Sequence, residues 1–424
     1  MKEFAMSNVS ILHGNIVHAP IFGQLEIREN AYLVLEGRYI AGIFDVLPEC
    51  YHGLDVTDYG TRILMPSFCD MHLHAPQYPM LGMGMDLPLL DWLATYTFKT
   101  ESRFSDNDYA RKIYRALAKD LIRHGTTRVV AFGSRHREAT LILMEEFENA
   151  GITGYVGKVN MDRNSAPLNE DTKDSISQTL HWLEESCRFK YIKPILTPRF
   201  TPSCSDELMA ALGKIARDLG LYVQSHLSEN TAEIAWVREL HPDCPQYWES
   251  YDKYGLFKSH TVMAHCVHSD ERERKAMRDK NVLVAHCPDS NVNLISGVAP
   301  VRVLLDEGVW VALGSDIAGG ADLSMMRVIA HAIRSSKFKR IQTVWNDDFL
   351  TVPEAFYLGT SSAARYFGAR PGFAVGDELH AIVLDDTTLP DSDRLSVRER
   401  FERSFYLCDD RHIAAVYSAG RKVV

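Results

Sequence analysis

Short apolar runs of strand length alternate with helical patterns through the middle of the chain. Eight such runs can be counted, at residues 63–73, 128–132, 154–159, 191–196, 221–224, 261–264, 282–285 and 309–313. Between them, apolar residues recur at the spacing of an amphipathic helix, as in Ile113, Leu117 and Leu121. Strand followed by helix, repeated over roughly 300 residues, predicts an α/β protein with a TIM-like (β/α)₈ barrel. A doubly wound sheet is the alternative, but no G-x-G-x-x-G motif follows the first strand.

Local signals place two of the predicted helices. Ser105 and Asp108 have the spacing of a capping box at the start of the helix that ends before Gly125. Ser205 is the expected N-cap of another helix, which ends at Gly220.

Both ends of the chain have β patterns of a different kind. Residues 32–35 and 39–44 flank Glu36-Gly37-Arg38, a hairpin signal, and residues 413–417 and 421–424 flank a second turn. We therefore expect a small β-sandwich domain formed by residues 1–65 and 371–424, around a barrel domain of residues 66–370.

Composition narrows the class of partners. The 424-residue chain has a formal net charge of −10 and no basic block, which argues against nucleic acid and anionic membranes as partners. No apolar run is long enough to span a membrane, and the first ten residues lack the apolar core of a signal peptide. Eight scattered cysteines form no C-x-x-C pair, so the sequence favours a reducing cytoplasm.

Polar residues of metal-binding type stand where the predicted strands end. His72 and His74 end the first strand, His226 and His265 follow the fifth and sixth, and Asp316 follows the eighth. In a barrel these positions meet at one rim, where active sites are built. His72-Leu73-His74 alone is more often two unrelated histidines, but ligands from three further strands favour a shared metal ion.

Nitrogen and oxygen ligands without a thiolate suit zinc, or iron in some hosts. Asp316 is expected as a weak ligand and as the base that takes a proton from water; its alternative role is the N-cap of a helix. Some barrel hydrolases hold two metals bridged by a modified lysine at the end of strand four. That strand ends Leu196-Thr197-Pro198-Arg199-Phe200, with Lys193 too early, so one zinc ion is expected.

Glu229 follows His226 by three residues and is the leading acid/base candidate, able to protonate a ring nitrogen during attack. The alternative is a solvent-facing glutamate in the first turn of a helix.

Several motifs together resemble one family. Residues 66–78, PSFCDMHLHAPQY, resemble the opening motif of the amidohydrolase superfamily. Residues 86–98 and the motifs TPRF, QSHLSEN, AHCP and GSDIAGG resemble the guanine deaminase family in order and spacing, over nearly the whole chain. Ser67 and Cys266 depart from the pattern, because glycine is usual at both positions.

This resemblance implies zinc-dependent hydrolysis of guanine to xanthine and ammonia, one zinc ion per subunit, and a homodimer. It implies catalytic roles for Glu229, Asp316 and His265, and substrate contacts by Gln77, Arg199, Phe200 and His226. Arg199 could instead form a structural salt bridge, and Gln77 could cap a loop. The alternatives to this function are a related deaminase or chlorohydrolase acting on cytosine, adenosine or a triazine, and an inactive barrel used for protein assembly.

Overall fold

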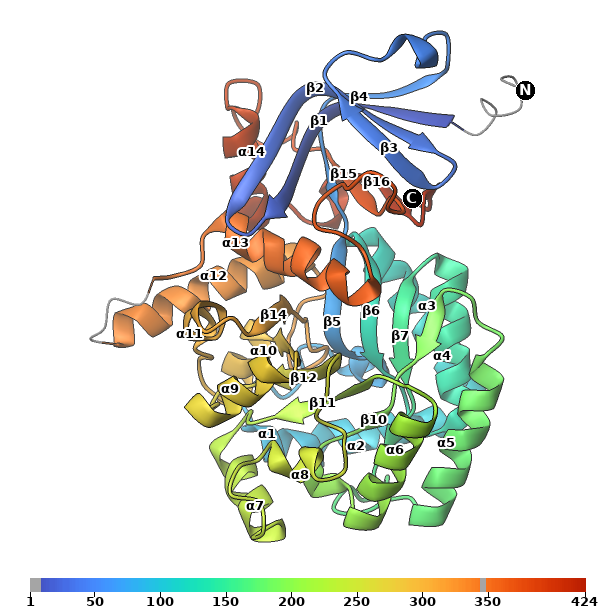
Figure 1. Cartoon of the computed structure of the whole chain (residues 1–424), viewed down its shortest axis with the longest axis vertical. Coiled ribbons are helices and arrows are strands. Elements are labelled where there is room, and N and C mark those ends of the chain that lie inside the picture. The colour runs from blue at the N-terminus through green and yellow to red at the C-terminus, as the bar shows by residue number, and fades with distance from the viewer. Residues whose placement is uncertain (1–8, 344–347) are drawn as a thin grey trace.

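The computed structural model describes residues 9–343 and 348–424. Residues 1–8 of the predicted β domain and residues 344–347 of the predicted barrel domain lie outside the described residues. A β-rich part built near the two chain ends lies over one end of a larger α/β part (Figure 1). Among the described residues, no helix combines the length and apolar character needed to cross a membrane.

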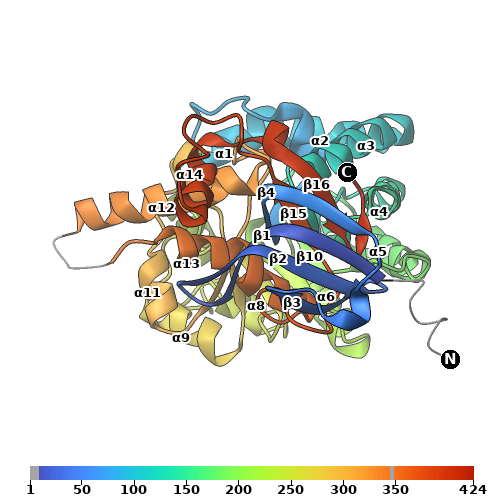
Figure 2. The ribbon, with the colours of Figure 1, turned by 90° about the horizontal axis from the view of Figure 1, so that it is seen from above.

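Strands from both ends of the chain share one seven-stranded sheet, seen from above in Figure 2. Its order is β17-β16-β15-β4-β1-β2-β3. The strands are β1 (Val9–Ile21), β2 (Gln24–Glu36), β3 (Tyr39–Phe44), β4 (Val56–Pro66), β15 (Ala381–Leu384), β16 (Ile413–Ser418) and β17 (Arg421–Lys422).

The sheet has its own core. Leu33 of β2, Leu64 of β4 and Val383 of β15 are fully buried in one cluster, so residues far apart in the sequence are packed together by the hydrophobic effect. The predicted hairpin is confirmed: β2 pairs antiparallel with β3, and Gly37 in the turn has a φ of 65°, which glycine adopts without steric cost.

Eight of the remaining strands form two parallel sheets of four. The first has the order β5-β6-β7-β9 and the second β11-β12-β13-β14. Their bounds are β5 (Phe68–His74), β6 (Thr126–Phe132), β7 (Thr153–Gly157), β9 (Ile192–Pro194), β11 (Val223–Leu227), β12 (Thr261–His265), β13 (Leu283–His286) and β14 (Trp310–Leu313). A short pair, β8 (Val159–Asn160) and β10 (Thr197–Pro198), accompanies them. These strands are buried throughout most of their length because helices cover them, which explains their continuous apolar runs.

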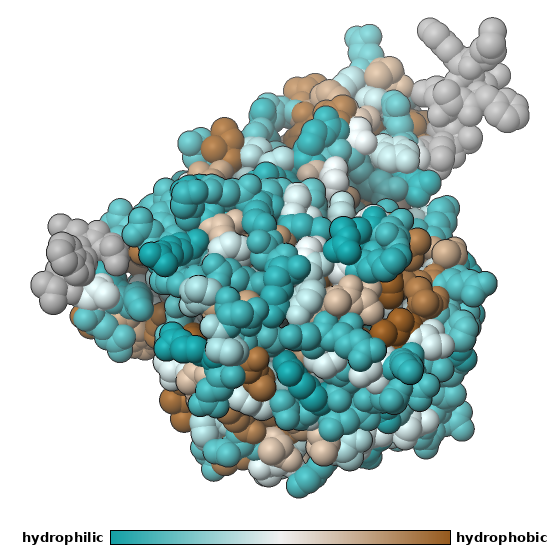
Figure 3. Space-filling view, turned by 60° about the horizontal axis from the view of Figure 1, so that its bottom comes forward, coloured by the Kyte–Doolittle hydropathy of each residue, from teal (hydrophilic) through white to brown (hydrophobic). Residues whose placement is uncertain are grey.

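Helices lie between the parallel strands and after the last of them. They are α1 (Leu89–Trp92), α2 (Phe98–Ser102), α3 (Asn107–Arg123), α4 (Arg137–Ala150), α5 (Thr172–Ser186), α6 (Asp206–Asp218), α7 (Thr231–Leu240), α8 (Glu249–Asp252), α9 (Glu271–Asp279), α10 (Pro288–Asn293), α11 (Val301–Asp306), α12 (Met325–Gln342), α13 (Val352–Tyr357) and α14 (Val397–Leu407). Hydrophilic residues cover most of the face in Figure 3.

One predicted cap is confirmed and one is wrong. The Ser205 side chain accepts a hydrogen bond from the backbone N–H of Leu208 at the start of α6. Helix α3 is capped by Asp106, whose side chain accepts from the N–H groups of Asp108 and Tyr109, whereas Ser105 donates to Ser102. The carboxylate one residue later reaches the free N–H groups and replaces the predicted capping box.

The first predicted run is in fact two strands. Strand β4 ends at Pro66 and β5 begins at Phe68: the backbone N–H of Ser67 still donates to the His380 carbonyl at 3.1 Å, whereas that of Phe68 donates to the Gly125 carbonyl at 2.9 Å. The chain therefore passes from the terminal sheet into the first parallel strand within one residue.

Candidate metal centre and active site

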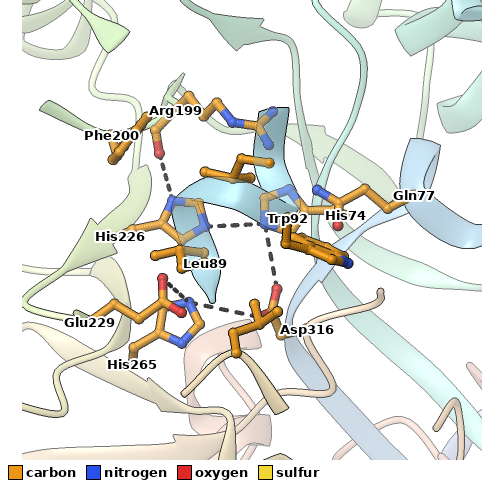
Figure 4. Close-up of a pocket in the computed structure, with 12 residues that line it drawn as sticks. His74, Gln77, Leu89, Trp92, Arg199, Phe200, His226, Glu229, His265 and Asp316 are labelled. Atoms are coloured by element: carbon orange, nitrogen blue, oxygen red, sulfur yellow. Dashed lines mark hydrogen bonds and ion pairs between the residues drawn. The ribbon is translucent and has the colours of Figure 1, made fainter. Parts of the chain in front are cut away.

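The predicted ligands lie at the carboxyl ends of the parallel strands. His72 and His74 belong to the end of β5, His226 to β11 and His265 to β12, while Asp316 follows β14. The side chains of His74, His226, His265 and Asp316 surround one centre (Figure 4). Strands β11 and β12 pair in parallel with Leu227 opposite His265, so the two strands end at the same height in the sheet.

Short distances join the five side chains. His72 Nε2 lies 3.2 Å from Asp316 Oδ1, and His74 Nε2 lies 3.5 Å from the same oxygen. The Nε2 atoms of His74 and His226 are 3.1 Å apart. His265 Nε2 lies 3.8 Å from Asp316 Oδ2. The five form two overlapping groups that share His72, and the ligand atoms of each group lie within 4.8 Å of one another.

The donor set fits a divalent cation. His72 is fully buried; its Nε2 lies near the Asp316 carboxylate, but neither ring nitrogen makes a hydrogen bond in the described part of the chain. An unpaired buried polar group is costly, and a cation bound at this imidazole would remove the cost. Burial also lowers the pKa of His74 and His226, which favours the neutral form that ligates metals.

Two further residues orient the histidines. His226 Nδ1 lies 2.6 Å from the Arg199 carbonyl oxygen, and His265 Nδ1 lies 2.9 Å from Asn291 Oδ1. Since both partners accept, each Nδ1 donates and leaves the Nε2 lone pair directed at the centre.

The backbone around the site is strained. Ser228, His265, Cys266 and Asp316 have φ values of 47°, 73°, 51° and 49°. Such conformations cost about 1–3 kcal/mol each and persist where the surroundings impose them. Cys266 thus has the left-handed backbone conformation, which glycine adopts at a lower energetic cost. Glycine is the usual residue at this position in the family that the sequence resembles.

Glu229 lies inside the site, so the solvent-facing alternative is wrong. Its side chain is 4 % exposed, Oε1 accepts from the Ser296 hydroxyl at 3.0 Å, and Oε2 lies 3.5 Å from His265 Nε2. Burial raises the pKa of the Glu229 carboxyl. A protonated carboxyl near neutral pH can donate to a bound ring.

Asp316 is not a helix N-cap, because Ser324 precedes α12. Although burial alone would raise the pKa of Asp316, its contacts with His72, His265 and Ser290 lower it to about 2. Asp316 therefore stays ionised, as a ligand or proton acceptor must.

The predicted substrate contacts line the same pocket. Its walls are formed by His74, Gln77, Leu89, Trp92, Leu93, Arg199, Phe200, His226, Glu229, His265, Leu294 and Asp316. Arg199 also forms a salt bridge, as the alternative interpretation of this residue expected: its Nη1 atom lies 2.6 Å from Glu101 Oε2. Gln77 Nε2 donates to Glu101 Oε1 at 2.9 Å.

Sequence reasoning missed the residues that support the site. Glu101, Ser290, Asn291 and Ser296 contact it from helices and loops, away from any strand end, and no spacing marks them. His286, at the end of β13, is 1 % exposed, and both of its ring nitrogens lack a hydrogen-bond partner among the described residues.

The sequence of the chain matches the model of the Amidohydrolase family over residues 63–423. The chain therefore belongs to the amidohydrolase family, and it is a hydrolase acting on C–N bonds.

Relatives narrow this class. A guanine deaminase of Dictyostelium discoideum is 35% identical, covering 98% of both chains, and one of Mus musculus is 38% identical, covering 86% of this chain and 83% of the relative. The crystal structure of a C. acetobutylicum guanine deaminase with guanine bound in its active site superimposes with a TM-score of 0.96 at 43% identity, covering 98% of this chain and all of that one. Within the amidohydrolases, the chain belongs to the guanine deaminase family.

Proposed function

We propose that the protein hydrolyses guanine to xanthine and ammonia. The observation that carries this proposal is one pocket whose wall holds four potential metal ligands next to the fifth, His72, together with a buried carboxyl at Glu229 and the polar side chains of Gln77 and Arg199. The bound guanine in the C. acetobutylicum relative supports the same substrate.

The metal that we propose is a single zinc ion, held by His72, His74, His226, His265 and Asp316. Nitrogen and oxygen donors without thiolate suit this ion. When bound, zinc supplies Lewis acidity that makes water a nucleophile near neutral pH.

The protein side chains then move the protons. Asp316, ionised and 3.8 Å from His265, accepts a proton from the attacking water. Glu229 donates a proton to the ring nitrogen next to C2 as the C2–O bond forms. The C2–N bond to the exocyclic amine breaks as the new C2 hydroxyl becomes a carbonyl, and the hydroxyl proton passes through Glu229 to the amine, which leaves as ammonia. The proton held by Asp316 then returns Glu229 to its acid form. His265 contacts the developing tetrahedral carbon.

Recognition of the ring falls to three other residues. Arg199 donates to the guanine carbonyl oxygen, and Gln77 both donates and accepts along the ring edge. Phe200, with its ring centroid 6.4 Å from that of His226, packs beside the base. His226 contributes as a ligand and as part of the pocket wall.

We also infer that the parallel strands close into a (β/α)₈ barrel. The Asp316 N–H donates to the His72 carbonyl at 2.8 Å, and Leu196 bridges Val223, so each gap between the two sheets is linked. Residues 66–370 would form this barrel, and residues 1–65 and 371–424 a small β-sandwich folded around the core of the terminal sheet. A homodimer and a cytoplasmic location stay predictions.

The test is turnover by purified, zinc-loaded protein of guanine, adenosine, cytosine and a chlorotriazine, followed by release of ammonia or chloride. Guanine alone should be converted efficiently, with xanthine as the product. Ammonia or chloride from another ring, with none from guanine, would overturn the proposal, and inactivity on all four would favour a binding role.

A further inference from the structure

Glu101 of α2 joins the two side chains that we assign to ring recognition. One carboxylate oxygen accepts from Gln77 Nε2 at 2.9 Å, and the other accepts from Arg199 Nη1 at 2.6 Å. Glu101 is 3 % exposed and lies behind Gln77 and Arg199, outside the pocket wall. It therefore acts on a bound ring through its two partners.

The pair of Glu101 and Arg199 has no net charge. An arginine stays protonated, and among the described residues Glu101 is the carboxylate within salt-bridge distance of Arg199. Both side chains are almost completely buried, at 4 % and 3 % exposed, so water screens the two charges little. This wall of the pocket therefore offers directed N–H donors with little net positive potential.

Glu101 also determines which way the Gln77 amide points. A carboxylate accepts only, so Gln77 must present its NH₂ group to Glu101. On its other side, Gln77 Oε1 accepts from the backbone N–H of Ala318 at 3.0 Å. The amide is thus held from both ends, with one N–H and one lone pair left for a ligand.

We propose that Glu101 is a positioning residue that makes the pocket select a neutral purine ring over a negatively charged one. The inference rests on the proposed function and adds a rule for its substrate and product. Hydrolysis replaces an amine by a carbonyl, which makes the neighbouring ring N–H more acidic. A pocket with an unneutralised Arg199 would hold the resulting anion tightly, whereas the Glu101–Arg199 pair lets it leave.

The test compares inhibition by two oxopurines of different charge at one near-neutral pH, and the change in their ratio between variants is the readout. Hypoxanthine is neutral there, and urate carries a negative charge. In the zinc-loaded Glu101→Gln variant, which keeps the size of the side chain, we expect kcat/KM for guanine to fall about 10- to 100-fold, because Gln77 and Arg199 both lose a charged acceptor and one of them then faces an NH₂ group. The ratio of the inhibition constants of urate and hypoxanthine should shift towards urate by about tenfold or more.

Two variants serve as controls. Glu101→Asp keeps the charge and should keep the unaltered ratio, and Glu184→Gln changes an exposed glutamate of α5 and should change nothing. A loss of structure alone would weaken both inhibitors equally, so an unchanged ratio in Glu101→Gln overturns the inference.

A second variant keeps the test decisive if Glu101→Gln does not fold. Arg199→Gln removes the positive charge instead, and the ratio must then shift away from urate; a shift towards urate, or none, overturns the inference. Turnover of guanine by the unaltered protein is measured first. Its absence would count against the proposed function, while an unchanged ratio in an active protein counts against the role of Glu101.

Discussion

Replacing Asn291 should weaken the metal site without touching a ligand. Asn291 lies in α10, is 1 % exposed, and its Oδ1 accepts from His265 Nδ1 at 2.9 Å. His265 is also 1 % exposed, so water cannot take the place of the lost acceptor in Asn291→Ala. The Nδ1–H is then buried and unsatisfied, and the tautomer with its proton on Nε2 competes with the ligating one.

The expected size follows from these contacts. Leaving one buried donor unsatisfied costs about 1–3 kcal/mol, and loss of a hydrogen bond that orients a metal ligand typically lowers metal affinity about 10- to 100-fold. We therefore expect zinc affinity in Asn291→Ala to fall by about 30-fold, which corresponds to about 2 kcal/mol. Competition with a chelator of known affinity, with bound zinc measured by mass spectrometry, gives this number directly.

Matched variants separate orientation from packing. Asn291→Asp keeps an acceptor for His265 Nδ1 and should retain most of the affinity. Asn149→Ala removes an exposed asparagine side chain from α4 and should leave it unchanged. If Asn291→Ala binds zinc as tightly as the unaltered protein, the hydrogen bond does not hold His265 for the metal, and the reasoning fails.

Two further predictions concern buried carboxyls. Glu229→Gln should lower kcat for guanine about 10²- to 10⁴-fold with bound zinc unchanged, because an amide cannot shuttle protons. Glu239→Gln, which changes an exposed glutamate, is the control. A near-normal kcat in Glu229→Gln would contradict the acid/base role of Glu229. Glu273 is 2 % exposed, and burial raises the pKa of its carboxyl from 4.5 to about 7. Between these two pH values the folded protein keeps a proton that the unfolded chain releases, so the free energy of unfolding falls as pH rises from about 4.5 to about 7. Urea unfolding of Glu273→Gln at about pH 5 and about pH 8 should show the unaltered protein losing about 2–3 kcal/mol relative to the variant; a pH-independent difference would refute this.

The ligands could be predicted from the sequence because strand period and strand ends are local signals. The spacing of His72 and His74 places both on one side of a strand, and the position of Glu229 three residues after His226 marks it as the acid/base candidate. The resemblance adds the substrate contacts of Gln77 and Arg199. Glu101 could not be predicted in this way, because it meets Arg199 only after a helix folds over the strand ends, 98 positions away in the sequence. The cap of α3 was misplaced by one residue, since Ser105 and Asp106 are both good N-caps and only the backbone decides between them.

The strand order of the terminal sheet has a consequence for synthesis of the chain. Strand β4 lies between β1 and β15, and β15 is made about 300 residues after β4, roughly 15–60 s later at the usual rate of translation. During that interval one edge of β4 has no strand beside it, and an open edge is a template for pairing with other chains. Ser67 alone separates β4 from β5, so the strand that carries His72 and His74 directly follows the strand with the open edge. The segment from Ala381 to Val424, 44 residues long, therefore covers the open edge of β4 only late in synthesis. Chains released from ribosomes that stall before this segment should be prone to aggregate.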